Sequence, residues 1–269
     1  MRLVNLLLGS WTGVVFAFLY LPVALLVLYS FNDSKLGIVW HGFTTRWYAE
    51  LWSNQTLIRA FKNSLVVAAW TTALSTVIGT AGGWLLFRYK YPFMRAIATL
   101  VFVPMIIPEI IMGISLLIFF AVVNAFLNER LFGDDVLGLG VTTIVISHVT
   151  FCFPFVMVAI QARLAGIDPA LEEAAMDLGA TRAQAFFKVI VPYLLPAIAS
   201  GALMSFTLSM DEFIVTYFVT GPGSQTLPLR IFGEVKKGLN PQLNAISTLF
   251  IVGTAVLVLA SEWVRKWGR

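Results

Sequence analysis

The stretch RLAGIDPALEEAAMDLGATRAQAFFKVIVP, residues 163–192, is a polar interval between two long apolar runs. Its first half carries the signals of a short helix that starts near Asp168. The Asp168 carboxylate can accept hydrogen bonds from amides at a helix start, and Pro169, at the first turn, has no amide that needs a partner. Glu172 and Glu173 follow, where negative charge complements the positive end of a helix. We therefore predict a short helix outside the membrane at this point of the chain.

The second half of the stretch predicts a turn and another short helix. Gly179 permits a sharp turn, because glycine adopts backbone conformations that other residues rarely reach. The second helix is expected over residues 182–189, and Pro192, which has no amide for the helix ladder, is expected to end it. The two helices form a helix-turn-helix elbow, and we expect residues 163–192 to lie on the cytoplasmic face of a membrane.

The chain around the elbow is too apolar for an ordinary soluble protein. Of its 269 residues, 59% are hydrophobic and 12% are charged, whereas soluble domains average roughly 45–50% and about 25%. The mean hydropathy is +0.86. A fold of this size has too little interior to hide so much apolar surface, so the surplus must face lipid. We predict an all-α integral membrane protein that is surrounded by a lipid bilayer.

Six apolar runs are long enough to cross a bilayer as helices. The third run is too long for one straight crossing and contains Pro104, Pro108 and Gly113, so we expect it to be bent or partly unwound. The first run lacks a clear cleavage pattern and is expected to be an uncleaved helix. One transmembrane domain, residues 1–269, then includes the elbow. The predicted spans cover residues 11–31, 64–87, 96–127, 138–161, 193–220 and 245–263.

Charged residues in the short loops predict the orientation. Arg88, Lys90 and Arg95 follow the second run, and positively charged short loops are usually cytoplasmic. Asp134 and Asp135 belong to the third connection, which is then expected outside. Both termini are cytoplasmic in this arrangement, as an even number of crossings requires. The net charge of +4 is distributed over such clusters and forms no basic stripe, so no nucleic-acid partner is expected.

Two segments on the outer side are long. Residues 32–63 contain several aromatic side chains, which predict an amphipathic interfacial helix near TTRWYAELW. Residues 221–244 contain glycine and proline signals and are expected to form a structured loop.

Three acidic residues fall within the predicted spans: Glu109 in the third, and Asp211 and Glu212 in the fifth. An ionised side chain at the bilayer centre costs about 3 kcal/mol or more, so it usually faces a water-filled path or a partner. All three are therefore candidates for a translocation pathway, which would favour a cationic solute. Neighbours on a helix diverge by about 100°, so Asp211 and Glu212 are not expected to point down one pore. Alternatively, these acids cap broken helices or pair with basic residues for assembly.

Other residues in the spans are expected to serve helix packing and not catalysis or metal binding. Gly79 and Gly83 have a spacing typical of close helix packing. His148 has Cys152 one turn away, and we expect a packed polar pair, because a metal site would need more ligands. With a single cysteine, no disulfide can form within the chain. No metal or other cofactor is expected in this chain.

The elbow also resembles a known family. Glu173, Ala174 and Ala175, followed by Gly179 and by VIVP ending at Pro192, are similar to the EAA motif of permeases from binding-protein-dependent ABC importers. In that family the segment is the coupling helix, which docks into a groove on a cytoplasmic ATPase. Small alanines let a partner approach the backbone, and a glutamate offers a charge to a basic partner. The chain has no GxxxxGK[ST] phosphate loop, so ATP and Mg are expected to bind a partner ATPase, and this chain is not expected to be an enzyme.

Longer stretches resemble the polyamine permeases of this superfamily, which carry putrescine or spermidine. The resemblance implies the six-helix ABC importer permease fold, with transport by alternating access across a bacterial inner membrane. It further implies three kinds of partner: a second homologous permease, two copies of an ATPase and a periplasmic solute-binding protein. Relatives often have two aspartates where this chain has Asp211 and Glu212. The similar stretches are residues 29–52, 147–156, 172–181, 205–223 and 239–248.

Other functions stay open at the level of sequence. Permeases for iron, thiamine or phosphonates share the EAA segment, so the motif identifies an ABC importer better than it identifies the solute. A secondary transporter would use Glu109, Asp211 and His148 as a proton relay and would need no ATPase. A membrane-embedded enzyme is a third class, for which the sequence offers no paired metal ligands and no nucleophile constellation.

Overall fold

A computed structural model describes residues 2–34, 39–89, 91–131, 137–168, 170–236, 238 and 241–267. The regular secondary structure of these residues is helical, apart from one isolated β-bridge between Asn32 and Phe43. Four residues used in the sequence predictions lie outside it: Lys90, Asp134, Asp135 and Pro169.

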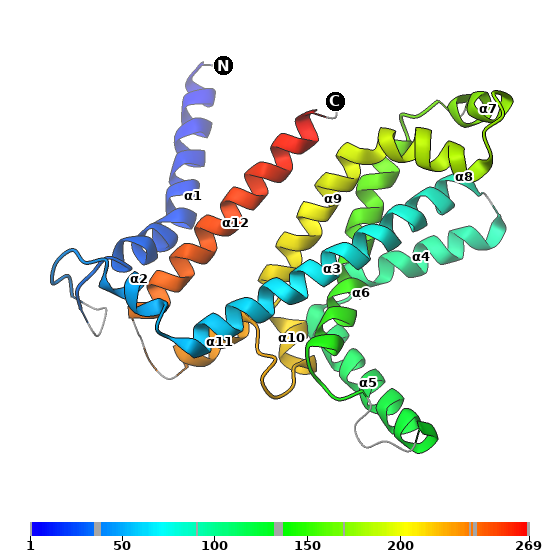
Figure 1. Cartoon of the computed structure of the whole chain (residues 1–269). Coiled ribbons are helices and arrows are strands. Elements are labelled where there is room, and N and C mark those ends of the chain that lie inside the picture. Colours follow the sequence, from blue (N-terminus) through cyan, green and yellow to red (C-terminus); the bar gives the residue numbers. More distant parts are fainter. Residues whose placement is uncertain are drawn as a thin grey trace. The chain divides into compact units, whose positions relative to one another are not determined.

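Six helices within the described residues are long and apolar enough to cross a membrane, which confirms the predicted number (Figure 1). They are α1 (Arg2–Tyr29), α3 (Gln55–Arg88), α5 (Glu109–Leu131), α6 (Val141–Leu164), a run over Arg182–Asp211 and α12 (Pro241–Trp267). The shorter helices are α2 (Arg46–Leu51), α4 (Pro92–Ile106), α7 (Ala170–Asp177), α10 (Ile214–Val219) and α11 (Leu227–Val235).

The third apolar run is broken, as its prolines predict. The helix α4 ends at Ile106, and Ile107 adopts an extended conformation with φ −68° and ψ 133°. The next residue is Pro108, whose ring disfavours the helical conformation in the residue before it. Glu109 then begins α5. The acid therefore lies directly after a helix break and not within a continuous helix.

The fifth run differs from the prediction at both ends. Pro192 does not end a short helix, because α8 (Arg182–Ala185), a π-helical turn (Phe186–Ile190) and α9 (Val191–Asp211) follow one another without interruption. In the wide turn the Val191 N–H donates to the Phe186 carbonyl. This widening makes room for a proline ring near the carbonyl four residues earlier, where it would clash in an α-helix. At the other end, the predicted span breaks at Glu212.

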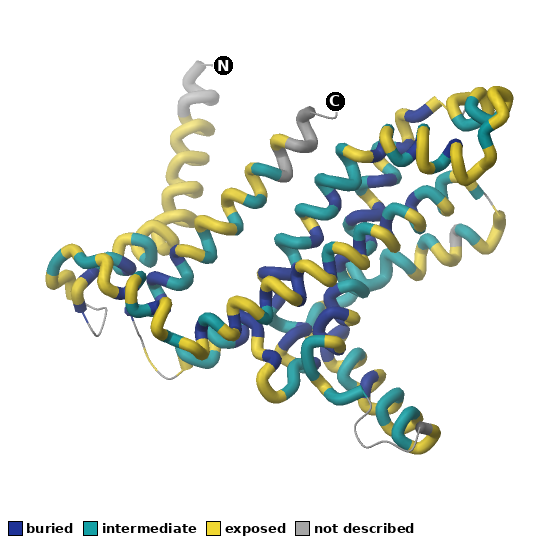
Figure 2. Tube along the Cα trace, viewed as in Figure 1, coloured by how far each residue is buried: buried dark blue, intermediate teal, exposed yellow. Residues whose placement is uncertain are grey.

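The chain divides into two compact units, which are described separately. The first comprises Met1–Arg59 and Arg230–Gly253, and the second comprises Ala60–Leu229 and Thr254–Arg269. In the second unit α6 is the central helix. Its first half packs with α5 and α10 around Ile144, and its second half packs with α9 and the elbow around Ile160. Figure 2 shows the buried residues gathered along these helices, whereas most of α1 is exposed.

Glycines on two helices allow close approach to α6. A Cβ atom at Gly79 would lie 2.7 Å from the Val156 Cβ, and one at Gly83 would lie 2.9 Å from the Ile160 Cγ2. On α9, a Cβ at Gly201 would lie 3.1 Å from the Val156 Cγ1. Val156 of α6 therefore packs between α3 and α9, and each of these helices has a glycine at the contact. The sequence prediction that Gly79 and Gly83 serve packing is confirmed.

We expect Gly79→Ala to lower the midpoint of thermal unfolding of the purified transporter in detergent. The new methyl group would meet the Val156 Cβ and also the Phe153 backbone oxygen at 2.9 Å, so α3 and α6 would have to separate. Overpacking of this kind costs about 1–3 kcal/mol. Gly253→Ala is the matched control, because no atom lies within 4 Å of a Cβ built at Gly253. Equal midpoints for the two variants would contradict the packing argument.

Candidate functional site

The elbow begins as the sequence predicts. The Asp168 Oδ1 accepts a hydrogen bond from the Ala170 N–H at 2.9 Å, which satisfies an amide at the start of α7. Glu172 and Glu173 lie in the first turn of α7, near its positive end. The role expected of Asp168 at the helix start is confirmed.

Gly179 ends α7 in a left-handed conformation, with φ +90°. The Gly179 N–H donates to the Met176 carbonyl at 2.9 Å, and the Ala180 N–H donates to the Ala175 carbonyl at 3.0 Å. These two bonds form a Schellman motif, which satisfies carbonyls that would otherwise be free at a helix end. A reciprocal capping box between Thr181 and Gln184 then starts α8. The turn predicted at Gly179 is confirmed.

Much of the elbow is exposed. No residue of α7 is buried, and the exposed residues include Glu173 and Ala174, while Ala175 is half-buried. Leu178, next to the turn, is 90% exposed. Pro192 is also exposed, in the first turn of α9. Apolar, acidic and small residues of the elbow are thus accessible, which suits contact with another protein.

An ion pair connects the elbow to the second membrane span. The Nε of Arg88, the last residue of α3, lies 3.0 Å from the Glu172 Oε2. A hollow of about 170 Å³ beside this pair is lined by residues of α3, α7 and the π-helical turn, including Trp84 and Ile190. The elbow is therefore attached to α3 as well as to the spans that flank it in sequence. From the sequence we expected Arg88 only to orient the chain, because nothing in the spacing indicates its partner.

The three acids of the predicted spans come together where two helices break. Glu109 begins α5, Asp211 is the last residue of α9, and Glu212 lies in the break before α10. Glu109 and Asp211 are near enough to Glu212 for their charges to repel it. Asp211 is exposed, Glu109 is half-buried and Glu212 is 7% exposed. The environments of the three carboxylates therefore differ.

Glu212 caps the helix that follows it. Its Oε1 accepts a hydrogen bond from the Val215 N–H at 2.8 Å, within the first turn of α10. The backbone leaves the helix at Glu212, which adopts φ −65° and ψ 115°. The carboxylate then supplies the acceptor that the Val215 N–H would have found in a continuous helix. The expected divergence of about 100° between Asp211 and Glu212 assumed one continuous helix, and that assumption is wrong. The alternative that an acid caps a broken helix holds for Glu212.

His148 contacts both sides of the same break. Its Nδ1 lies 2.8 Å from the Ser209 Oγ of α9, and its Nε2 lies 2.8 Å from the Thr216 Oγ1 of α10. The predicted pairing with Cys152 is wrong, because the Cys152 thiol instead points to the Ser205 carbonyl at 3.8 Å. The two residues are one turn apart on α6, but their hydrogen-bond partners come from α9 and α10. Among the described residues, no group of three potential metal ligands occurs.

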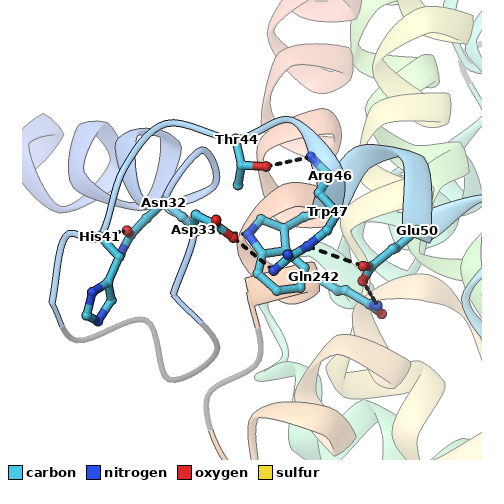
Figure 3. Close-up of polar contacts among 8 residues, drawn as sticks. All are labelled: Asn32, Asp33, His41, Thr44, Arg46, Trp47, Glu50 and Gln242. Atoms are coloured by element: carbon cyan, nitrogen blue, oxygen red, sulfur yellow. Dashed lines mark hydrogen bonds and ion pairs between the residues drawn. The ribbon is translucent and has the colours of Figure 1, made fainter.

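A second polar network lies in the first unit and centres on Arg46 of α2 (Figure 3). The Arg46 guanidinium lies 2.9 Å from the Asp33 Oδ1 and 3.4 Å from the Glu50 Oε1. It also lies 4.3 Å from the ring centroid of Trp47, whose Nε1 donates to the Asn32 carbonyl at 2.8 Å. Trp47 is 5% exposed. Part of the predicted interfacial helix is thus buried within the unit and does not face a membrane.

The same network reaches the start of α12. The Gln242 Nε2 donates to the Glu50 Oε2 at 3.0 Å, and the Asn54 Nδ2 donates to the Gln242 Oε1 at 3.2 Å. Asn32 in turn accepts from the His41 N–H at 2.9 Å. These bonds join the described residues around Asn32 and His41 and those of α2 into one network, which Gln242, 192 residues after Glu50, connects to α12.

Comparison with known proteins decides the family. Residues 75–267 match the family described as "Binding-protein-dependent transport system inner membrane component". That match covers the elbow and both helix breaks. The chain belongs to this family. The EAA resemblance of the elbow is therefore confirmed at the level of the family.

The relatives cover almost the whole chain. "Spermidine/putrescine transport system permease protein PotC" of Escherichia coli (strain K12) is 40% identical over 97% of this chain and 95% of that protein. "Putrescine transport system permease protein PotI" of the same organism is 40% identical over 97% of this chain and 89% of that protein. The crystal structure of a bacterial ABC transporter involved in the import of the acidic polysaccharide alginate has a TM-score of 0.77 at 19% identity and covers 99% of both chains. The ABC importer permease fold is confirmed.

Family membership settles the class of protein. The chain is a multi-pass inner membrane permease subunit of an ABC importer, in which ATP is hydrolysed by a separate subunit. An ATPase and a solute-binding protein are therefore implied as partners. Neither a proton-coupled secondary transporter nor a membrane-embedded enzyme fits this assignment. Permeases of this family are not catalytic and bind no cofactor.

Proposed function

We propose that this binding-protein-dependent permease imports polyamines of the putrescine and spermidine type. The observation that carries the proposal is 40% identity over 97% of the chain to permeases named for spermidine/putrescine and for putrescine transport. Acidic residues near the helix breaks are consistent with a cationic solute. The whole chain, 1–269, would act as one permease domain with the elbow as its cytoplasmic part.

Asp211 is the residue best suited to line the translocation pathway. An acid at the C-terminal end of a helix faces the negative end of the helix dipole, so it does not stabilise α9. Asp211 is also exposed and lies near Glu212, whose charge repels it. Glu109, by contrast, is at the favourable end of α5. We therefore assign Asp211 the main contact with a polycation, with Glu109 beside it and Glu212 holding the backbone of the break.

The elbow would dock onto the ATPase. Glu173 and Ala174 are exposed on α7, and the apolar Leu178 beside Gly179 has little cover within the chain. A groove of another subunit that accepts this surface would bury the leucine and meet the carboxylate with a basic side chain. Movement of the groove would then pass to α6 and α9 through the chain itself and to α3 through the Arg88–Glu172 ion pair.

The complete assembly follows from this coupling role. We propose a second homologous permease beside this chain, two copies of the ATPase and a periplasmic binding protein. The elbow must lie in the cytoplasm to reach the ATPase, and six crossings then place both termini on the same side. Cycles of ATP binding and hydrolysis would move the elbows of the two permeases and alternate the access of the pathway between the two faces of the membrane.

The solute is tested by ATPase stimulation in reconstituted transporter. The chain is purified in mild detergent with the subunits that accompany it and placed in proteoliposomes with the candidate binding protein. We expect several-fold stimulation of ATP hydrolysis, together with uptake, when the binding protein is loaded with putrescine or spermidine. Stimulation by iron-, thiamine- or phosphonate-loaded binding protein instead would reassign the solute. Uptake without an ATPase would contradict the importer mechanism.

A further inference from the structure

His148 of α6 contacts both helices of the break, and both of its ring nitrogens have hydrogen-bond partners. The imidazole is 1% exposed. Ser209 lies two residues before Asp211, and Thr216 lies four residues after Glu212. The two contacts, each 2.8 Å long, therefore enclose the part of the chain that carries both acids.

The hydrogen bonds around the imidazole have a defined direction. The Thr216 hydroxyl donates its hydrogen to the Glu212 carbonyl at 3.1 Å. It must therefore accept from His148, which puts the ring proton on Nε2. In the neutral imidazole Nδ1 is then an acceptor, and the Ser209 hydroxyl donates to it. The result is one continuous chain of donors and acceptors from Ser209 through His148 and Thr216 to the backbone of Glu212.

Other contacts hold α10 against α5 and α6. The Thr143 Oγ1, near the start of α6, donates to the Val219 carbonyl at 2.8 Å. On the side of α5, a Cβ at Gly113 would lie 2.6 Å from the Phe218 Cδ2. The second half of α10 is therefore fixed by packing and by Thr143, whereas its first half is held by the buried Val215, by the Glu212 cap and by the hydrogen bond from His148. The imidazole joins that first half to α9 through its two hydrogen bonds.

We propose that His148 is a positioning residue that fixes the break between α9 and α10, and that solute passage depends on the break being fixed. A buried apolar side chain of similar size would fill the same space. It would nevertheless leave the Ser209 hydroxyl free to bond to a carbonyl of α9, as serine side chains commonly do, and it would leave the Thr216 oxygen without its donor on α6. Glu212 and Asp211 would then lose their fixed places relative to α6. The consequence for transport rests on the proposed pathway role of Asp211.

The test uses three substitutions of His148 in the assembled transporter in proteoliposomes, with the ATPase and loaded binding protein present. We expect His148→Leu to lower uptake about tenfold, which corresponds to 1.4 kcal/mol. Stimulated ATP hydrolysis should stay within about twofold of the parent, or about 0.4 kcal/mol, because the elbow is untouched. The amide of His148→Asn can occupy the position of Nδ1 and that of His148→Gln the position of Nε2, so each should recover part of the loss. Parent-like uptake in His148→Leu would overturn the proposal.

Three further variants separate positioning from simple loss of folding. Ser147→Ala is the matched control, because Ser147 is buried next to His148 but donates to Thr143 of its own helix at 2.7 Å. It should transport like the parent. Ser209→Ala combined with Thr216→Val should reproduce the loss seen in His148→Leu, and adding His148→Leu to that pair should lower uptake no further. If uptake, ATP hydrolysis and thermal midpoint fall together, the role is structural and the proposal is wrong.

The outcome also distinguishes this inference from the proposed pathway. If His148→Leu lowers uptake and Asp211→Asn does not, the break is positioned as we propose but another group contacts the solute. If Asp211→Asn lowers uptake and His148→Leu does not, the pathway assignment holds and the imidazole is dispensable.

Discussion

Replacing Gly179 with valine is expected to lower solute uptake about tenfold or more, while the permease still inserts into the membrane. The backbone at Gly179 has φ +90°, and a left-handed conformation costs an ordinary residue roughly 1–2 kcal/mol, with β-branched residues least tolerant. A Cβ atom would meet nothing within 4 Å. The effect would therefore come from the backbone alone. Relaxation of the turn would break the two Schellman bonds and change the direction of α7, so the docking surface would no longer match the ATPase.

The measurement compares uptake, stimulated ATP hydrolysis and the amount of ATPase that co-purifies with the permease. Gly179→Asn is the matched control, because asparagine adopts the left-handed conformation more readily than other non-glycine residues. It should retain most of the uptake. Glu173→Lys leaves the turn intact, since Glu173 is exposed, and it should also weaken ATPase binding. Parent-like uptake in both Gly179→Val and Glu173→Lys would contradict the docking role of the elbow.

The elbow was predictable because its signals are local. Asp168, Gly179 and Thr181 act on amides or carbonyls within a few residues, so the order of residues alone identifies the helix ends. The failure at Pro192 has the opposite cause. Proline disfavours an α-helix, but a π-helical turn accommodates it, and the widening involves Phe186, six residues earlier. Rules for single residues do not include such compensation.

The break region was only partly predictable because its contacts join distant parts of the chain. Pro108 marks one break in the sequence, but no proline or glycine marks the break at Glu212. The carboxylate caps α10 only when the chain has already left the helix, and the imidazole of His148 supports that geometry from more than 60 residues away. Arg88 and Glu172 are similarly distant in sequence. Side-chain partners of this kind depend on which helices pack together, which hydrophobic patterns alone do not specify.

Asp211→Asn is expected to raise the solute concentration needed for half-maximal uptake about tenfold and to leave the transporter at least as stable as the parent. Two unit charges 4 Å apart interact with about 4 kcal/mol at an effective dielectric constant of 20. Loss of a third of this energy is enough to weaken solute binding tenfold. The stability expectation has the opposite sign, because the substitution removes a negative charge from the C-terminal end of α9 and from the neighbourhood of Glu212.

These opposite signs make the experiment decisive between a pathway role and a structural one. Uptake of putrescine and spermidine is measured in proteoliposomes, and the midpoint of thermal unfolding is measured on the same preparations. Glu129→Gln is the control, because Glu129 is an exposed acid in the last turn of α5 and its loss changes the net charge equally. An acid that only supports assembly should lower both uptake and the midpoint when neutralised. Neutralising an acid that contacts the polycation should lower uptake and leave the midpoint unchanged or higher. The loss of uptake should be larger for spermidine, which carries more charge, than for putrescine.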